Sequence, residues 1–404
     1  MDERRPALAA ALAVIAVIAV AGCGVRARSG ARADVPGGRP GSSRSFPGKH
    51  LPPARPLTGP LIIDLSWTSS RRGWALEAEP CGRGLCPRLA GTADGGRSWR
   101  ALPSPPGVIQ YRDGAPELAQ IRFATARIGY LSGPALYRTA DGGQTWHRVP
   151  GPPTEALHPA DGSVVRVAYR GTGCPGPCTR IVQEAAAGTT RWRTLLRITL
   201  PLDESQAVTS QVIRSGRSVI YVPVYGNLAA GAGTQHTVIF RTTGGGTWQR
   251  LPDPCPGTGT ATRDTTGIAA GPGGFLAALC APRDQTGHLY VLTSADHGST
   301  WSMPRPLPAT GTDYLIAAAS PGRLAVATGG ASGSGPYAYR LLESADGGRH
   351  WTTAAAGTAQ LNPRAPAVAG LGFASPDAGW WISDPHSIWI TSDGGRTWHR
   401  HPIR

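Results

Sequence analysis

Five aspartates recur in one short pattern, Ser/Thr-x-Asp-x-Gly-x-x-Trp, and could in principle do acid chemistry. Carboxylates at regular spacing could bind Ca²⁺ or act as the acid and base of a hydrolase. A catalytic site, however, is built once in a protein, whereas this pattern returns about every 50 residues. We therefore expect the aspartates to stabilise a repeated turn. They are Asp94, Asp141, Asp296, Asp346 and Asp393, followed by Trp99, Trp146, Trp301, Trp351 and Trp398.

Two further copies of the pattern are eroded. Residues 185–192 keep the frame and end in Trp192, but Ala187 stands where the aspartate is expected. Residues 242–248 are one residue shorter, with Gly244 at that place and Trp248 at the end. Seven copies then lie 46 to 57 residues apart, a length that suits four short strands and their turns.

A second pattern lies upstream of several copies, an apolar residue followed six positions later by glycine. This offset predicts a turn between two short strands, and the flanking segments are rich in Val, Ile, Tyr and Phe. The Asp pattern then falls between the third and fourth strands of each unit, where its glycines can adopt positive φ. We predict an all-β, single seven-bladed β-propeller of four-stranded antiparallel blades. The instances are Trp67…Gly73, Phe123…Gly129, Ile268…Gly274 and Phe373…Gly379.

These motifs resemble the Asp-box, or BNR, repeat over residues 57–404. Together with the aromatic–glycine pattern, they are most similar to the photosystem II assembly/stability factor-like family of seven-bladed propellers. Sialidases, sortilin ectodomains and xyloglucanases carry the same box on other propellers. The resemblance implies a scaffold role, with the boxes on the face remote from any active site.

The N-terminal segment has the pattern of an export signal. Arg4 and Arg5 precede an apolar run over residues 7–20, which is short for a membrane span and ends in Val-Ala-Gly-Cys23. This end resembles a bacterial lipobox, which implies cleavage before Cys23 and a lipid on its sulfur. An ordinary secretory signal or an uncleaved anchor are the alternatives. We expect a signal peptide over residues 1–22, a Gly/Pro/Ser/Arg-rich tether over 23–56, and the propeller over 57–404.

The chain carries a formal net charge of +15, of which about +6 falls in the tether. A basic tether beside a membrane is attracted to anionic lipids. Lys49 is the one lysine among 40 basic residues, which favours a G+C-rich, actinobacterial genome as the origin of the arginines. Export and the lack of a recognisable module argue against a nucleic-acid partner. We expect an extracytoplasmic, lipid-anchored protein at the bacterial cell membrane.

Six cysteines remain after Cys23, and an even number in an exported chain indicates disulfides. The expected strand order places all six at turns on the face opposite the boxes, which we call the cysteine face. We predict the pairs Cys81–Cys86, Cys174–Cys178 and Cys255–Cys280. A zinc site from the two close pairs is the weaker alternative, because the spacings are loose and their blades are not neighbours.

No catalytic, metal or cofactor set is recognisable. A sialidase needs an arginine cluster, a Tyr/Glu nucleophile pair and an acid, and its Arg-Ile/Leu-Pro signature is missing here. The histidines His158, His236, His288 and His386 lack metal-ligand spacing. The acids expected on the cysteine face are interpreted as solvated loop residues. They are Asp113, Glu117, Glu155, Asp203, Glu204, Asp253 and Asp384.

Two functions therefore stay open. The first is a monomeric, non-enzymatic propeller that binds a protein or peptide client through the cysteine face and the central mouth, where the loops are longest. The second is a sialidase-like glycan hydrolase or glycan-binding protein. Paired carboxylates or an arginine cluster at the mouth would favour the second. The loops of interest are 103–120, 227–235 and 329–336.

Overall fold

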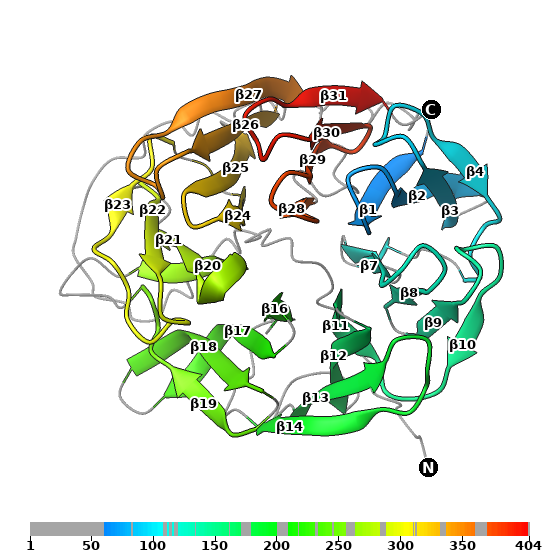
Figure 1. The fold of residues 1–404 in the computed structure, drawn as a ribbon, viewed down its shortest axis with the longest axis horizontal. Helices are drawn as coiled ribbons and strands as arrows, with labels where there is room; N and C mark the ends of the chain where they lie inside the picture. Colours follow the sequence, from blue (N-terminus) through cyan, green and yellow to red (C-terminus); the bar gives the residue numbers. More distant parts are fainter. Residues whose placement is uncertain are drawn as a thin grey trace, which may run out of the picture.

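The computed structural model contains seven antiparallel sheets arranged as a ring (Figure 1). The predicted lipid site Cys23 and the tether lie outside the described residues. Within those that are described, no helix is both long and apolar enough to span a bilayer. The structure describes residues 60–402 except 82–83, 108–110, 113–114, 117–119, 134, 161, 171–178, 200–208, 217, 231–232, 245, 256–262, 283–287, 310, 312, 332–336 and 360–369.

The first three blades each use four consecutive strands, in chain order from the axis outward. Blade 1 consists of β1 (Leu61–Trp67), β2 (Gly73–Cys81), β3 (Gly84–Thr92) and β4 (Arg100–Leu102). A small hairpin, β5 (Tyr111–Arg112) and β6 (Ala115–Pro116), precedes blade 2. Blade 2 consists of β7 (Gln120–Phe123), β8 (Gly129–Ser132), β9 (Leu136–Thr139) and β10 (His147–Val149). Blade 3 consists of β11 (Thr154–Ala160), β12 (Ser163–Arg170), β13 (Thr179–Ala186) and β14 (Arg193–Thr199).

The other four blades follow the same order, except that two short strands share the inner position of blade 4. Blade 4 consists of β15 (Thr209–Ser210), β16 (Ile213–Ser215), β17 (Val219–Ala230), β18 (Gly233–Thr243) and β19 (Trp248–Leu251). Blade 5 consists of β20 (Arg263–Ala270), the 3₁₀ turn η1 (Pro272–Gly274), β21 (Leu276–Pro282), β22 (Tyr290–Ser294) and β23 (Arg305–Pro306). Blade 6 consists of β24 (Asp313–Ser320), β25 (Arg323–Ala331), β26 (Tyr337–Ser344) and β27 (Thr352–Ala359). Blade 7 consists of β28 (Gly370–Phe373), β29 (Gly379–Asp384), β30 (Ser387–Thr391) and β31 (His399–Pro402).

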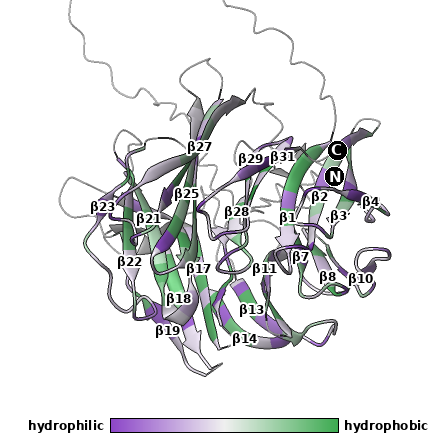
Figure 2. Ribbon diagram, turned by 45° about the horizontal axis from the view of Figure 1, so that its top comes forward, coloured by the Kyte–Doolittle hydropathy of each residue, from purple (hydrophilic) through white to green (hydrophobic). Residues whose placement is uncertain are grey.

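The hydrophobic core lies between the blades. Apolar side chains gather in one cluster at each of the seven blade interfaces. Figure 2 shows the apolar stretches along blade strands such as β1 and β18. Each sheet therefore buries both faces against its neighbours, which is what a ring of blades allows and a single blade could not achieve. The predicted fold class is confirmed.

The ring closes without a shared sheet, because blades 1 and 7 are each built from one continuous segment. Instead, Ile62 and Leu65 of blade 1 pack against Ile388 and Ile390 of blade 7. The amide of Ile62 also donates to the carbonyl of Pro385 at 2.7 Å. Figure 1 shows the two blades side by side. Closure thus depends on side-chain packing and a few polar contacts between the chain's first and last blades.

The aromatic–glycine pattern has a steric origin. Trp67 and Gly73, Phe123 and Gly129, and Phe373 and Gly379 are directly paired residues at the turn between the first two strands. In each pair the ring covers the glycine backbone, so that a Cβ there would lie 2.6 Å from a ring atom. The fourth instance is different, because Gly274 belongs to η1 and faces His297.

Replacing Gly129 with alanine is expected to destabilise the fold by about 1–3 kcal/mol, the usual effect of overpacking. Phe123 cannot move aside, because it is stacked on Trp74 with ring centroids 3.7 Å apart and meets Trp146 edge-on. Gly246→Ala is the matched control, since the nearest atom to its added Cβ is 4.0 Å away. Urea denaturation of both variants provides the measurement, and equal losses would contradict the steric explanation.

Candidate functional site

The Asp boxes are closed turns whose carboxylates are occupied by their own loops. In the first box, Asp94 Oδ1 accepts the amide of Ser98 at 3.0 Å and Oδ2 accepts its hydroxyl at 2.5 Å. The hydroxyl of Thr92 donates to Asp94 and in turn accepts the amide of Gly96 at 2.9 Å. These donors, the hydroxyl of Ser98 first, hold the pKa of Asp94 well below its usual range. The other four boxes repeat this arrangement, so their role is structural.

The two eroded boxes keep the turn without the carboxylate. The amides of Ala187 and Gly244 donate to the carbonyls of Gly162 and Ser218, both at 2.8 Å. In the first box the corresponding donor is the amide of Gly95, the residue after the aspartate, which bonds to the carbonyl of Arg71. Trp192 lies against Arg166, whose guanidinium carbon is 4.1 Å from the ring centroid. Blades 3 and 4 therefore keep the four-stranded fold although their boxes lack the aspartate.

A cavity of about 180 Å³ lies on the axis of the ring, and all seven blades contribute to it. It is the candidate functional site because all seven blades converge on it, whereas a second cavity, of about 510 Å³, lies between blades 1 and 2 beside their boxes. The residues that line the axial cavity are Asp64, Gln120, Arg122, Ala156, Leu157, His158, Gln211, Val212, Thr266, Gly267, Ile268, Tyr314, Leu315, Ile316, Gly370, Leu371 and Trp380.

One side of this cavity, which we call the polar wall, comes from blades 1 to 4. Asp64 on β1 is buried, and its carboxylate accepts the amide of Ile121 at 2.8 Å and the guanidinium of Arg122. Burial raises the pKa of Asp64, while Arg122 and the Ile121 amide oppose the rise. The pair joins blade 1 to blade 2, and a quarter of the Arg122 side chain stays exposed.

His158 on β11 extends the polar wall. Burial, reinforced by the positive charges of Arg122 and Arg214, lowers the pKa of His158 to about 4. The imidazole is therefore neutral near pH 7. On the next blade, Gln211 accepts the Tyr225 hydroxyl at its Oε1 at 3.1 Å, which leaves its amide N–H groups as donors.

The opposite side, which we call the apolar wall, comes from blades 5 to 7. Ile268 of β20, Ile316 of β24 and Leu371 of β28 line it together with Trp380. Trp380 belongs to β29 but lies over β28, since a Cβ at Gly370 would be 2.6 Å from its ring. The charged and amide side chains of the cavity thus come from blades 1 to 4, and its largest apolar side chains come from blades 5 to 7.

Several acids predicted to be solvated are instead structural. Glu155 is a buried residue of β11, paired with Arg180 at 3.0 Å and accepting the amide of Ser210 at 2.7 Å. Asp384 is buried at the end of β29 and accepts the amide of His386 at 2.9 Å. The interpretation as loop residues was wrong for both, because each ties neighbouring backbone segments together. Asp253 is half-buried and accepts the hydroxyl of Thr265 at 2.6 Å.

The other candidates do not form a site. His288 and His386 are exposed, and among the described residues no group of His, Cys, Asp or Glu could hold a metal ion. Asp113, Glu117, Asp203 and Glu204 lie outside the described residues, as does the side chain of His236. Sequence reasoning missed Asp64 and Arg122. The signal for Asp64 was available, because it is the one charged residue in the apolar strand LIIDLSW.

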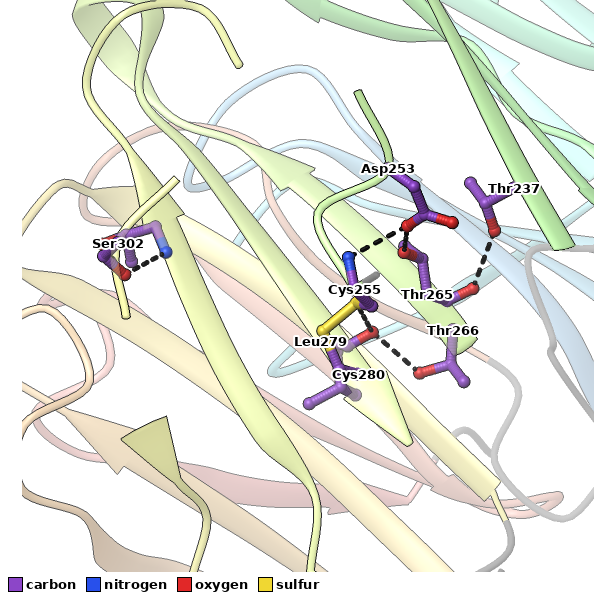
Figure 3. The surroundings of a disulfide bond; sticks show 9 residues. Thr237, Asp253, Cys255, Thr265, Thr266, Leu279, Cys280 and Ser302 are labelled. Atoms are coloured by element: carbon purple, nitrogen blue, oxygen red, sulfur yellow. Dashed lines mark hydrogen bonds between the residues drawn. A yellow bond between two sulfur atoms is a disulfide. The ribbon is translucent and has the colours of Figure 1, made fainter. Parts of the chain in front are cut away.

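Two of the three predicted disulfides are present. Cys81–Cys86 bridges the β2–β3 hairpin, and Cys255–Cys280 joins the segment after β19 to β21 of the next blade. Around the second, the amide of Cys255 donates to Asp253 at 3.0 Å, and Asp253 also accepts the Thr265 hydroxyl (Figure 3). Both bridges lie at the strand ends opposite the boxes. Cys174 and Cys178 fall outside the described residues.

Replacing Cys81 and Cys86 together with alanine is expected to lower the free energy of unfolding by about 2 kcal/mol, the small value typical of a short loop. Denaturation of the oxidised protein and the double variant measures the loss. Peptide mapping without reductant should recover the Cys81–Cys86 bridge. Recovery of these cysteines as free thiols, or in bridges to Cys174 or Cys178, would contradict the pairing.

No protein-family model matches the sequence, and no curated protein matches it either. Solved structures do match the fold. A structure of YCF48 bound to D1 peptide is 18% identical, with a TM-score of 0.52 over 85% of this chain and 94% of the other. YCF48 from Cyanidioschyzon merolae is 14% identical, with a TM-score of 0.51 over 84% and 97%. A PL25 ulvan lyase bound to a GlcA(1-4)Rha3S saccharide is 10% identical, with a TM-score of 0.51 over 83% and 90%.

Sequence identities this low establish a similarity of fold and nothing further. The propeller is similar to YCF48 and also to a polysaccharide-degrading enzyme, so the fold alone does not select between a binding protein and an enzyme. The resemblance found in the boxes is confirmed at this level. The function has to be argued from the cavity.

Proposed function

We propose that this protein is a lipid-anchored, extracytoplasmic propeller that binds a peptide or protein segment at the cysteine face, over the central cavity, without catalysing a reaction. The observation that carries this proposal is the cavity's mixed chemistry, with the donors Arg122 and Gln211 on blades 2 and 4 and large apolar groups on blades 5 to 7. A peptide offers carbonyl acceptors and apolar side chains at short spacing, which complements both kinds of group.

The chemistry of the cavity gives less support to a glycosidase. Retaining glycosidases need two carboxyl groups about 5–5.5 Å apart. Among the described lining residues, Asp64 is the one carboxylate, and it is engaged with Arg122 and the backbone of blade 2. YCF48, whose fold is similar, has been solved with a bound peptide. A propeller of this fold can therefore hold a peptide, which is compatible with the proposal.

Site-specific photo-cross-linking tests the proposal. A photo-reactive residue replaces Gln211 at the cavity in one variant and the exposed Arg97 at a box in the matched control. Both full-length proteins are expressed in the native membrane and irradiated, and cross-linked fragments are identified by mass spectrometry. Peptide adducts from position 211 and none from 97 are expected. Glycan adducts at 211, or turnover of sialosides and uronic-acid glycans by the purified protein, would favour the glycan alternative instead.

The anchor is tested separately. Cys23→Ala should prevent lipidation, because it removes the sulfur that carries the lipid in the proposed scheme. Metabolic labelling with an alkyne fatty acid should mark the wild-type chain and not the variant. Labelling of both proteins, or of neither, would contradict the lipid anchor at Cys23.

A further inference from the structure

The interface between blades 1 and 2 is partly open beside the boxes. The cavity there, which we call the box-side cavity, has a volume of about 510 Å³. This value lies within the range of roughly 300–1,000 Å³ usual for small-molecule sites. Residues of the first box and of β4 line the cavity from blade 1, and residues of the second box line it from blade 2. A ligand bound there would contact both blades.

The opening is explained by one glycine. Gly91 comes directly before the first box, and the other six blades carry a residue with a side chain at this position. In blades 2 and 4 this residue is an arginine that bonds to a backbone carbonyl in the box of the next blade. In blade 1 that bond comes from Trp74 on β2, whose indole N–H donates to the carbonyl of Gly142 at 3.1 Å. The space above Gly91 therefore stays open. The residues at the equivalent positions are Arg138, Glu184, Arg241, Thr293, Glu343 and Ile390.

Two arginines line this space. Trp74, Gly91 and Arg100 are successive partners across β2, β3 and β4, so their side chains project from the same face of blade 1. Trp74 stacks on Phe123 of blade 2, which identifies this face as the one toward the cavity. Arg72, at the end of the turn between β1 and β2, lines the cavity as well. Both arginines are exposed, and neither guanidinium forms a hydrogen bond or an ion pair with another described residue.

The charges that line the box-side cavity favour an anion. One carboxylate, that of Asp141, stands against the two guanidiniums of Arg72 and Arg100. Asp141 is engaged in its own box, where it accepts the amides of Gln144 and Thr145, both at 2.9 Å. The two arginines can donate charge-assisted hydrogen bonds to a carboxylate or a phosphate of a ligand.

The rest of the lining fits a sugar ring. Trp99 and Leu102 are half-buried and offer apolar surface. Ser98 and Gln144 are exposed beside them and carry a hydroxyl and an amide. A saccharide offers both kinds of group, because the C–H face of its ring can pack on an indole while its hydroxyls bond to polar side chains. An acidic peptide side chain lacks the hydroxyls, and inorganic phosphate lacks the apolar face.

We propose that the box-side cavity binds an acidic saccharide, with its carboxylate or phosphate toward Arg72 and Arg100 and its sugar ring on Trp99. Polymers of uronic acids and of sugar phosphates both present this chemistry, an oxyanion attached to a sugar. The inference goes beyond the proposed function and does not depend on it, because the axial cavity shares no lining residue with the box-side cavity. Loss of saccharide binding would leave peptide binding at the axis unaffected.

A glycan array probed with the full-length protein in detergent micelles tests this proposal. The array carries uronic-acid oligosaccharides and sugar phosphates, each beside its neutral counterpart, which is the methyl ester or the unphosphorylated sugar. Tri-glutamate represents an acidic peptide. Retention on at least one acidic saccharide and on none of the neutral counterparts is expected, and the uronic-acid and phosphate spots distinguish the two sources. Retention on no acidic saccharide, or equally strong retention on tri-glutamate, would overturn the proposal.

Charge-matched variants locate the binding. Arg72→Gln/Arg100→Gln should weaken binding of the retained saccharide at least tenfold in calorimetric titration, because two charged donors are lost. Arg71→Gln/Arg148→Gln removes the same charge from exposed arginines that do not line the cavity and should leave binding unchanged. Equal losses in the two double variants would indicate a general charge effect and would overturn the site.

Gly91→Ile provides an independent test. Ile390 occupies this position in blade 7, and an isoleucine at Gly91 would fill the cavity while leaving both arginines in place. Saccharide binding should be abolished, and unchanged binding would place the ligand elsewhere. Circular dichroism checks that the variant is folded, since a Cβ at Gly91 would lie 3.2 Å from Leu102. If Gly91→Ile does not fold, the two double arginine variants still decide the question.

Discussion

Replacing Glu155 with glutamine is expected to reduce the free energy of unfolding by about 3–5 kcal/mol, the cost of leaving a buried charge without its partner. Glu155 and Arg180 are both 4% exposed, and their ion pair is 3.0 Å long. The carboxylate also accepts the amide of Ser210, at 2.7 Å, across the interface between blades 3 and 4. The substitution therefore weakens an ion pair and an inter-blade contact at once.

The same blade offers a matched control. Glu184 and Arg193 form a pair of similar length, 2.9 Å, but the arginine side chain is 66% exposed. Exposed pairs contribute up to about 1 kcal/mol, so Glu184→Gln should have little effect. Adding Arg180→Met to Glu155→Gln should recover part of the loss, because it removes the buried charge that has lost its ion pair with Glu155. Urea denaturation at pH 7 measures all three, and similar losses for Glu155→Gln and Glu184→Gln would contradict the role given to burial.

The fold was largely predictable because its signals are local. The hydroxyl of Thr92, the carboxylate of Asp94 and the amide of Ser98 bond within one loop, so the pattern shows in any one copy. The aromatic–glycine pattern is also local, since Trp67 and Gly73 are paired across one turn. Repetition then fixed the number of blades, even where Ala187 and Gly244 replace the aspartate.

Ring closure could not be predicted, because it joins residues far apart in the chain. Ile62 and Ile390 lie in the first and last blades and read as ordinary strand residues. The cavity is similar, since its lining collects one to three residues from each of the seven blades. No spacing along the chain indicates that Asp64, Gln211 and Leu371 share one pocket.

The acids were misjudged for a physical reason. A carboxylate near the end of a short strand, such as Glu155 or Asp384, looks like a loop residue in the sequence. Both are buried here because the next blade or the next turn supplies a backbone amide, and another strand of the same blade supplies an arginine. The cost of burying such a charge is offset by partners that are distant in the sequence or come from a different strand.

Glu77 provides the second large expected effect, a loss of stability as the pH rises. It is 2% exposed on β2, and its Oε1 has no hydrogen-bond partner among the described residues. Burial raises the pKa of Glu77 to about 7; Arg88 opposes the rise and the neighbouring Glu79 adds to it. The folded state then holds this proton more tightly than the unfolded chain, in which the carboxyl titrates near 4.5. Stability attributable to Glu77 is therefore present below pH 4.5, falls between about 4.5 and 7, and is gone above that.

The difference between the two pKa values corresponds to about 3 kcal/mol. Other buried groups also titrate, so the test compares Glu77→Gln with the wild-type protein at pH 5 and pH 8 by urea denaturation. The wild type should lose about 2–3 kcal/mol more than the variant between these two values, because glutamine cannot ionise. Glu79→Gln is the control, since its side chain is 43% exposed and should change the pH dependence little. If Glu77→Gln and the wild type lose equal stability between pH 5 and pH 8, the carboxyl of Glu77 must ionise without penalty. In that case its buried oxygen must have a partner such as an internal water.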